Sequence, residues 1–138
     1  MKDTIPMAET TAGPTLSDSK LMAFAATIDP ARAKQFYGTT LGLRLVTEDG
    51  FALVFDANGT PLRVSTVREI IPAPYTVLGW QVQDIVAAAE ALAAAGVVFE
   101  RYAGFGQDEY GIWTAPGGFA RVAWFKDPDG NVLSISQH

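Results

Sequence analysis

The chain has 138 residues, 49% of them hydrophobic and 11% aromatic, which suits one sizeable core and is too little for two ordinary domains. Its formal net charge is -5 and its basic residues form no cluster, so it lacks the surface typical of proteins that bind nucleic acids or anionic membranes. It contains no cysteine, which excludes disulfides, thiolate metal sites and cysteine nucleophiles.

Residues 1–19 are expected to form a flexible tail. They are rich in Thr, Ser, Pro and acids, and contain neither the apolar run of an export signal nor an Arg-rich amphipathic pattern. No later apolar stretch approaches the ~18 residues that a membrane span needs. We therefore expect a soluble, cytoplasmic protein with a single domain over residues 20–138.

A first βαβββ module is predicted over about residues 20–67. An apolar run at residues 21–28 ends at Asp29-Pro30, an N-cap followed by proline at the first helical position, and the helix should end near Gly42. The pair Asn58-Gly59 is a strong hairpin signal between the last two strands. The three strands are expected at residues 43–49, 51–57 and 60–66.

A second module of the same kind is predicted over about residues 75–137. A strand at 76–82 leads to Asp84, the N-cap of an alanine-rich helix that Gly96 closes. Further strands are expected at residues 97–102, 110–116, 119–125 and 132–136. The halves therefore look like copies of one module.

The segment DPDGNVLSI (127–135) begins like a calcium loop, with acidic or amide side chains at alternate positions. An EF-hand loop needs a glutamate at its twelfth position, but that position is His138. The related segment DANGTPLRV (56–64) occupies the same place in the first module and lacks the second carboxylate. We therefore interpret both segments as turns, in which Asx side chains close the backbone and glycine adopts a positive φ.

Two motifs carry a resemblance to a known family. The run D-P-x-x-A-x-x-F-Y-x-x-x-L-G-L (29–43) and the closing F-x-D-P-D-G-N (125–131) resemble the vicinal oxygen chelate superfamily, which includes glyoxalase I, bleomycin-resistance proteins and extradiol dioxygenases. The resemblance implies an α+β fold of two tandem βαβββ modules. Their curved mixed sheets would enclose a pocket, often completed in a homodimer.

In metal-dependent members of that family, ligands project from the first and last strands of each module. The resemblance places the corresponding positions at Met22, Arg63, Val77 and Ser134. None of these side chains is a good ligand for a divalent metal, because such ions prefer carboxylate, carbonyl or imidazole donors. We therefore expect no metal and no cofactor.

Two other features offer alternatives to this reading. His138, the single histidine, is interpreted as a solvated end or tag remnant rather than a catalytic or metal-binding residue. Asp108 and Glu109 are interpreted as part of a solvated loop, although a non-standard metal site or a general base there stays open. The glycine-rich loop at 102–111 is expected to close over the pocket with Phe105 on the ligand.

Apolar and aromatic walls with a few polar groups suit an organic ligand. Trp80 is expected to face its helix instead of the ligand. The predicted ligand-contacting residues are Met22, Phe24, Arg63, Val77, Gln81, Phe105, Tyr110, Trp113, Trp124 and Ser134.

The favoured function is metal-free binding of a small organic molecule, as in the bleomycin-resistance branch of the family. The alternatives are a lyase, isomerase or dioxygenase that uses a non-standard metal site or a carboxylate base, and an accessory module that only dimerises. The acidic surface favours a cationic ligand, whereas Arg63 favours an anionic one.

Overall fold

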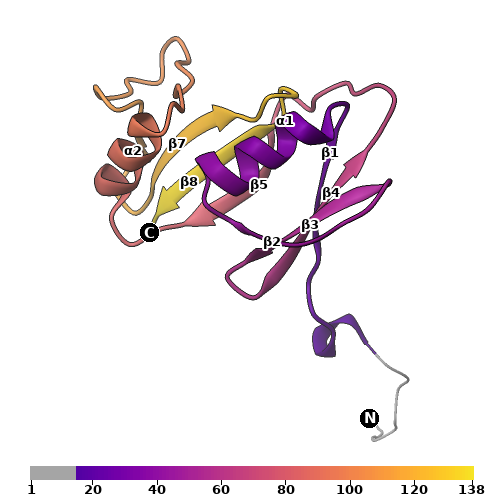
Figure 1. Ribbon diagram of the computed structural model, residues 1–138. Helices are drawn as coiled ribbons and strands as arrows, with labels where there is room; N and C mark the ends of the chain where they lie inside the picture. The colour runs from indigo at the N-terminus through magenta and orange to yellow at the C-terminus, as the bar shows by residue number, and fades with distance from the viewer. Residues whose placement is uncertain (1–14) are drawn as a thin grey trace, which may run out of the picture.

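The structure, a computed structural model, describes residues 15–138, which form two four-stranded β-sheets with helices packed against them (Figure 1). Residues 1–14 of the expected tail lie outside the described part. The rest of that segment contains one 3-10 turn, η1 (Leu16–Asp18), in which no residue is buried.

The first module has the predicted βαβββ order. β1 (Ala23–Thr27) leads into helix α1 (Pro30–Lys34), which continues as a π-helical segment, η2 (Gln35–Thr40). The remaining strands are β2 (Arg44–Glu48), β3 (Ala52–Ala57) and β4 (Thr60–Thr66). The sheet order is β1-β4-β3-β2, with β1 parallel to β4 and the other neighbours antiparallel.

Local signals place the boundaries of this module. The Asp29 carboxylate accepts a hydrogen bond from the Arg32 amide at 3.1 Å, which caps α1 as expected. Gly42 follows the helical segment with a φ of 74°. Asn58 and Gly59 have φ values of 52° and 92°, the positive pair that a two-residue hairpin loop requires, so the hairpin prediction is confirmed.

The second module repeats the arrangement. Asp84 caps helix α2 by accepting from the Ala87 amide at 3.1 Å, and Gly96 follows the helix with a φ of 103°. The sheet order is β5-β8-β7-β6, the counterpart of the first. The elements are β5 (Thr76–Gln81), α2 (Ile85–Ala94), β6 (Trp113–Thr114), β7 (Arg121–Lys126) and β8 (Val132–Gln137).

Two predicted strands are wrong in extent. The segment 97–102 forms only an isolated bridge between Phe99 and Phe125, with one bond from the Glu100 amide to the Trp124 carbonyl of β7. The pairing extends no further, because the Glu100 carbonyl and the Tyr102 amide bond to the Gln107 side chain. The strand expected at 110–116 shrinks to the two residues of β6. Gly111 before it has a φ of 86°, and Pro116 after it has no amide proton to donate.

One face of each sheet forms the core, as the alternation of residues along the strands predicts. In Figure 1 helix α1 of the first module lies over strands β5 and β8 of the second. Phe36 of the same helical segment approaches Phe125 of β7 with ring centroids 6.5 Å apart, so both modules share one core. Sheet residues in this core are Leu53, Phe55, Leu62, Val64, Ala123, Phe125, Leu133 and Ile135.

The carboxylate of Asp127 joins the two modules. Its Oδ2 accepts hydrogen bonds from the Tyr37 hydroxyl at 2.6 Å and from the Asn131 amide nitrogen at 2.7 Å. Its Oδ1 accepts from the backbone amides of Asp129 and Asn131, both at 2.9 Å. Burial and the neighbouring Asp127 raise the pKa of Tyr37 above its ordinary value, so the hydroxyl remains a donor.

The same turn also reaches β1 of the first module. The Asn131 side chain donates to the Ala26 carbonyl at 3.0 Å, and Asp129 accepts from the Ile28 amide at 3.0 Å. Gly130 has a φ of 88°, and its amide bonds to the Asp127 carbonyl. The turn interpretation of residues 127–131 is therefore confirmed: their side chains serve as contacts between modules.

Within residues 15–138, no helix is both long enough and apolar enough to cross a membrane. The cytoplasmic location stays a prediction.

Replacing Tyr37 with phenylalanine should lower the free energy of unfolding by about 1–3 kcal/mol, because the buried Asp127 carboxylate would lose a donor. Chemical denaturation measures this difference. Tyr75→Phe is the matched control, since Tyr75 is 67% exposed and should tolerate the change. Equal stability of the two variants would contradict the role of this hydrogen bond.

Candidate functional site

The faces of the two sheets that turn away from the core carry Met22, Arg63, Val77 and Ser134, the four positions that the resemblance in sequence pointed to. Ser134 of β8 is 8% exposed, whereas Met22 before β1 and Val77 of β5 are 44% and 40% exposed. Arg63 of β4 is half-buried. These faces are called the open faces below. The open face of the second sheet carries aromatic side chains, whereas that of the first carries Arg63.

Four aromatic rings gather on the open face of the second sheet, and they are called the aromatic cluster below. Trp113 of β6 and Trp124 of β7 have ring centroids 6.0 Å apart. Phe105 lies 5.9 Å from Trp113 and 5.8 Å from Trp124, and Tyr102 lies 5.6 Å from both Phe105 and Trp124. Edge-to-face or tilted contacts at such separations are favourable for aromatic rings.

The structure thus brings together three predicted residues, Phe105, Trp113 and Trp124. Tyr102 was not among the predicted ligand-contacting residues, although it begins the same glycine-rich segment as Phe105. A cavity of about 380 Å³ lies against the cluster. It is lined by Pro74, Tyr75, Thr76, Tyr102, Phe105, Trp124 and Val132.

The β8 and β5 side of the same open face is polar and has small side chains. Ser134 pairs with Trp124 on one side and with Gly79 on the other, and Ser136 pairs with Gln81. The predicted residues Ser134 and Gln81 therefore lie on the face that carries the aromatic cluster, and Ser134 is the neighbour of Trp124.

His138 bonds to the Ser136 hydroxyl, with 3.2 Å between Nε2 and Oγ. A serine–histidine pair used for nucleophilic catalysis needs a third group to orient the imidazole. Among residues 15–138 no carboxylate forms a hydrogen bond with this ring, which is exposed. The pair therefore lacks the arrangement of a catalytic triad.

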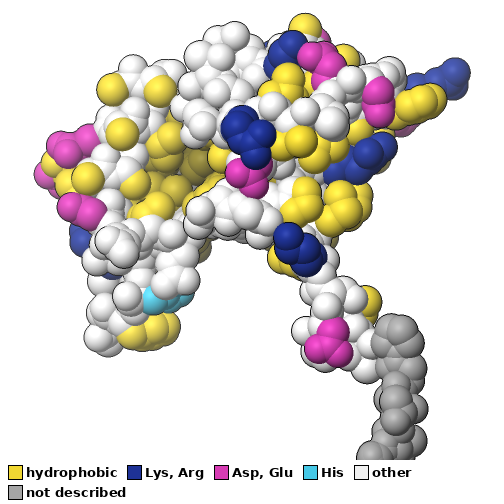
Figure 2. Space-filling model, turned by 60° about the horizontal axis from the view of Figure 1, so that its bottom comes forward, with side chains coloured by type: hydrophobic (Ala, Val, Ile, Leu, Met, Phe, Trp, Pro, Cys, Tyr) yellow, Lys and Arg dark blue, Asp and Glu magenta, His cyan; other side chains and the backbone are white. Residues whose placement is uncertain are grey.

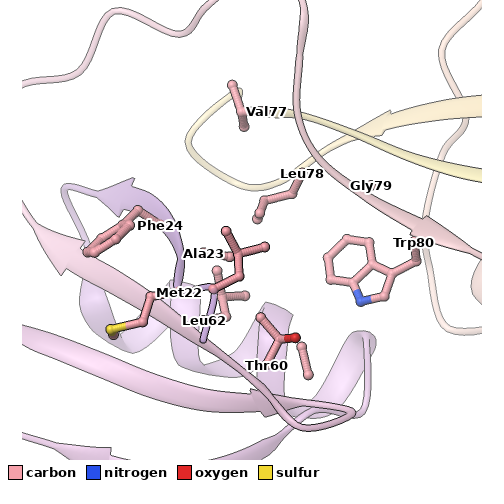
Figure 3. A pocket seen from close by; sticks show the side chains of 11 residues that line it. Met22, Ala23, Phe24, Thr60, Leu62, Val77, Leu78, Gly79 and Trp80 are labelled. Atoms are coloured by element: carbon pink, nitrogen blue, oxygen red, sulfur yellow. The ribbon is translucent and has the colours of Figure 1, made fainter. Parts of the chain in front are cut away.

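A second cavity, of about 520 Å³, opens between β1 and β5 (Figure 3). Met22 and Phe24 lie on one side and Trp80 lies opposite, with Leu78 between them. Thr60 supplies a polar side chain to an otherwise apolar lining.

Trp80 also borders a neighbouring apolar cavity of about 300 Å³ beside α2. Figure 2 shows hydrophobic side chains lining the hollow between the two parts of the molecule. Trp80 packs against the core cluster, in agreement with its expected orientation toward the helix side.

The loop at residues 100–112 is held by hydrogen bonds of its own. The Gln107 side chain accepts from the Tyr102 amide at 2.7 Å and donates to the carbonyls of Glu100 and Gly111 at 2.9 and 2.8 Å. Arg101 donates to the carbonyl of Asp108. These bonds fix both ends of the loop, and closure of Phe105 over a ligand stays a prediction.

Asp108 and Tyr110 have local roles in this loop. The Asp108 carboxylate accepts from the amides of Tyr110 and Ile112, both at 2.9 Å, so it stabilises a turn. The Tyr110 hydroxyl lies 3.5 Å from Glu90 of α2, away from the aromatic cluster. The structure therefore separates Tyr110 from the other aromatic residues of the predicted set.

Arg63 lies in the first sheet and pairs with Phe24 of β1 and Val54 of β3. It has no ion-pair partner among the described residues. The pKa of Asp49 lies below its ordinary value, mainly because the amides of Phe51 and Ala52 bond to it and to a lesser degree because of Arg63. Arg63 is thus a cation on the open face of the first sheet.

The four family positions do not fit a divalent metal. Thioether, guanidinium, aliphatic and hydroxyl side chains occupy them, and such a set offers neither imidazole nor carboxylate. Within residues 15–138, no group of three or more His, Cys, Asp or Glu side chains is placed to hold a metal ion.

Comparisons with known proteins identify relatives of this fold. The family model described as Glyoxalase/Bleomycin resistance protein/Dioxygenase superfamily matches residues 21–135. No curated protein gives a significant sequence match.

Several solved structures are similar at low sequence identity. A glyoxalase/bleomycin resistance protein/dioxygenase from Alicyclobacillus acidocaldarius has a TM-score of 0.68 and 18% identity, covering 88% of this chain and 92% of its own. A lactoylglutathione lyase from Agrobacterium tumefaciens has a TM-score of 0.66 and 18% identity, with coverages of 86% and 93%. The fosfomycin resistance protein FosX from Listeria monocytogenes has a TM-score of 0.68 and 13% identity, with coverages of 94% and 95%.

Replacing Gln107 with alanine should loosen the loop that carries Phe105, because the Tyr102 amide would lose its acceptor. Hydrogen exchange followed by NMR should show the Tyr102 amide exchanging at least about tenfold faster, as expected for a loss near 1.4 kcal/mol. Glu109→Ala, in the same loop but with an exposed side chain, is the control. Unchanged exchange in Gln107→Ala would show that the loop is held by other contacts.

Proposed function

The chain belongs to the Glyoxalase/Bleomycin resistance protein/Dioxygenase superfamily, and from this premise we propose that it binds a small organic molecule without a metal. The proposed site is the open face of the second sheet. The named relatives include a lactoylglutathione lyase and a fosfomycin resistance protein, whose names refer to small organic compounds. That shared class supports the kind of ligand proposed here.

The observation that carries the proposal is the aromatic cluster, which lies on the face of the second sheet that does not pack against the core. Phe105 is 45% exposed to solvent. An exposed ring forgoes the stabilisation that burial of its apolar surface would give, and a bound ligand would supply it. Four rings beside a cavity of about 380 Å³ provide stacking surface, and the neighbouring strands provide hydroxyl and amide groups that would orient a ligand.

The chemistry of the polar groups supports binding over catalysis. A general base must be free to take a proton from the ligand, whereas the Asp108 carboxylate already accepts two backbone hydrogen bonds. The side chains at the four family positions are poor metal donors. Both observations weigh against the alternative of a lyase, isomerase or dioxygenase.

Planar aromatic compounds such as indole and 2-naphthol should bind more tightly than saturated rings of similar size. Phe105→Ala should weaken this binding about tenfold, since stacking on an aromatic side chain contributes roughly 1–3 kcal/mol. Titration calorimetry measures the affinity. Phe119→Ala is the matched control, because Phe119 is 71% exposed and lies outside the aromatic cluster.

Metal analysis of the same protein separates binding from metal chemistry. Plasma mass spectrometry after dialysis against manganese, nickel, zinc and iron(II) should find less than about a tenth of an equivalent of each metal. A full equivalent of one metal, or equal affinity of Phe105→Ala and Phe119→Ala for the aromatic probes, would refute the proposed function.

We further propose that a second copy of this chain covers the cavity between β1 and β5. Both strands are edge strands, paired on one side only. The apolar side chains around them are exposed, with Leu21 at 76% and Phe24 at 59%. Exposed apolar edges favour association, and two identical copies would cover each other's edges about a two-fold axis.

Sedimentation velocity tests this association. The wild-type protein should sediment as a dimer, and Phe24→Lys should shift it to a monomer because a charge would be placed in the contact. Phe51→Lys is the matched control, since Phe51 is 76% exposed but belongs to the loop between β2 and β3. A monomeric wild-type protein would exclude the homodimer.

A further inference from the structure

Three neighbouring strands place Trp124, Ser134 and Gly79 side by side in the second sheet. Trp124 of β7 pairs with Ser134 of β8, and Ser134 pairs with Gly79 of β5. All three lie on the open face, where Trp124 lines the cavity beside the aromatic cluster and Gly79 lines the cavity between β1 and β5. Across this row, the large indole side chain of Trp124 is followed by the small side chain of Ser134 and then by Gly79, which has none.

A side chain at Gly79 would compete with the Ser134 hydroxyl for the same space. A Cβ atom built on Gly79 would lie 2.8 Å from the Ser134 hydroxyl oxygen, closer than real contacts allow. The φ of Gly79 is not in the positive region, so the backbone conformation alone does not demand glycine. The Ser134 hydroxyl thus occupies the gap above Gly79.

Ser134 is also a polar residue with little access to water. It is 8% exposed, and within residues 15–138 its hydroxyl has no hydrogen-bond partner, although the oxygen keeps a small contact with solvent. A ligand that covers this face would exclude water from the hydroxyl, so a polar ligand atom placed there would have to supply its hydrogen bond. Its position beside Trp124 means that one ligand would touch both groups.

An ionic group on the same strand as Trp124 is already paired. Lys126 follows Trp124 by two residues, and its ammonium lies 3.6 Å from the Glu100 carboxylate. The charge of each therefore compensates the other, and the row itself holds no charged side chain. An uncharged polar group on the ligand suits this setting better than an ionised one.

We propose that Ser134, in the gap that Gly79 leaves, is the specificity-determining residue of the site and selects a planar aromatic ligand with an uncharged hydroxyl, carbonyl or amide group at its edge. The ring system stacks on the aromatic cluster while the polar group bonds to the Ser134 hydroxyl. This inference rests on the proposed function, because it requires ligand binding at the aromatic cluster.

The test compares 2-naphthol with naphthalene, which differ by one hydroxyl and are both uncharged at neutral pH. Ligand-observed NMR titration of the full chain should give a Kd for 2-naphthol about five- to tenfold lower than that for naphthalene, as one hydrogen bond provides. Ser134→Ala should remove this preference, so that 2-naphthol and naphthalene bind with equal Kd values. Ser136→Ala, a matched change on the same strand and face, should retain the preference.

Gly79→Ala provides an independent variant. Its added methyl group would displace the Ser134 hydroxyl, so the preference for 2-naphthol should fall as it does in Ser134→Ala. The double variant should lose no more of the preference than either single variant, because both changes act on one hydroxyl. Circular dichroism and thermal denaturation establish that each variant is folded.

The outcomes separate the two proposals. If the wild-type protein binds both probes equally, or Ser134→Ala keeps the preference, the role of Ser134 is refuted while binding at the aromatic cluster stands. If the wild-type protein binds neither probe and Phe105→Ala behaves like wild type toward every aromatic compound tried, the site itself is refuted.

Discussion

The buried carboxylate of Asp127 is the constraint on which the arrangement of the two modules depends. A carboxylate with so little access to water is stable only when donors surround it, and here they come from its own turn and from Tyr37 of the other module. Asn131 extends the contact to the carbonyl of Ala26 in β1. Separation of the two modules would break these hydrogen bonds and expose the apolar core that the modules share.

This contact also determines which surfaces remain for a ligand. Because helix α1 and the turn at 127–131 join the modules on the helix side, the opposite faces of both sheets are left open (Figure 1). The aromatic cluster is then assembled from two strands and a loop, and the side chain of Gln107 sets the path of that loop. The site therefore depends on local hydrogen bonds as well as on the shared core.

The sequence was most informative where the structure depends on neighbouring residues. The caps at Asp29 and Asp84 and the hairpin at Asn58-Gly59 follow from short-range geometry, and strand alternation separates core from open faces. The segment at 97–102 had the composition of a strand, but the Gln107 side chain binds its Glu100 carbonyl, and only an isolated bridge to β7 remains.

Within the candidate site, the predicted trio of Phe105, Trp113 and Trp124 does meet, because two of its members alternate onto one face of adjacent strands. The place of Tyr102 depends on the fold of a loop, which composition does not determine. The importance of Gly79 depends on its pairing with Ser134, and an irregularity between Thr76 and Leu78 shifts that register. These contacts join residues that are distant in the sequence, so only the folded structure reveals them.

The contact between Tyr37 and Asp127 spans 90 residues, and this separation has a consequence for the order of folding. While the chain is being synthesised, the first module emerges with its tyrosine hydroxyl and much of its helix still lacking their partners. Only when residues 127–131 have left the ribosome does that surface become covered. Until then the first module should stay incompletely folded, with apolar surface exposed. At this stage the nascent chain is most prone to aggregation and most dependent on a chaperone.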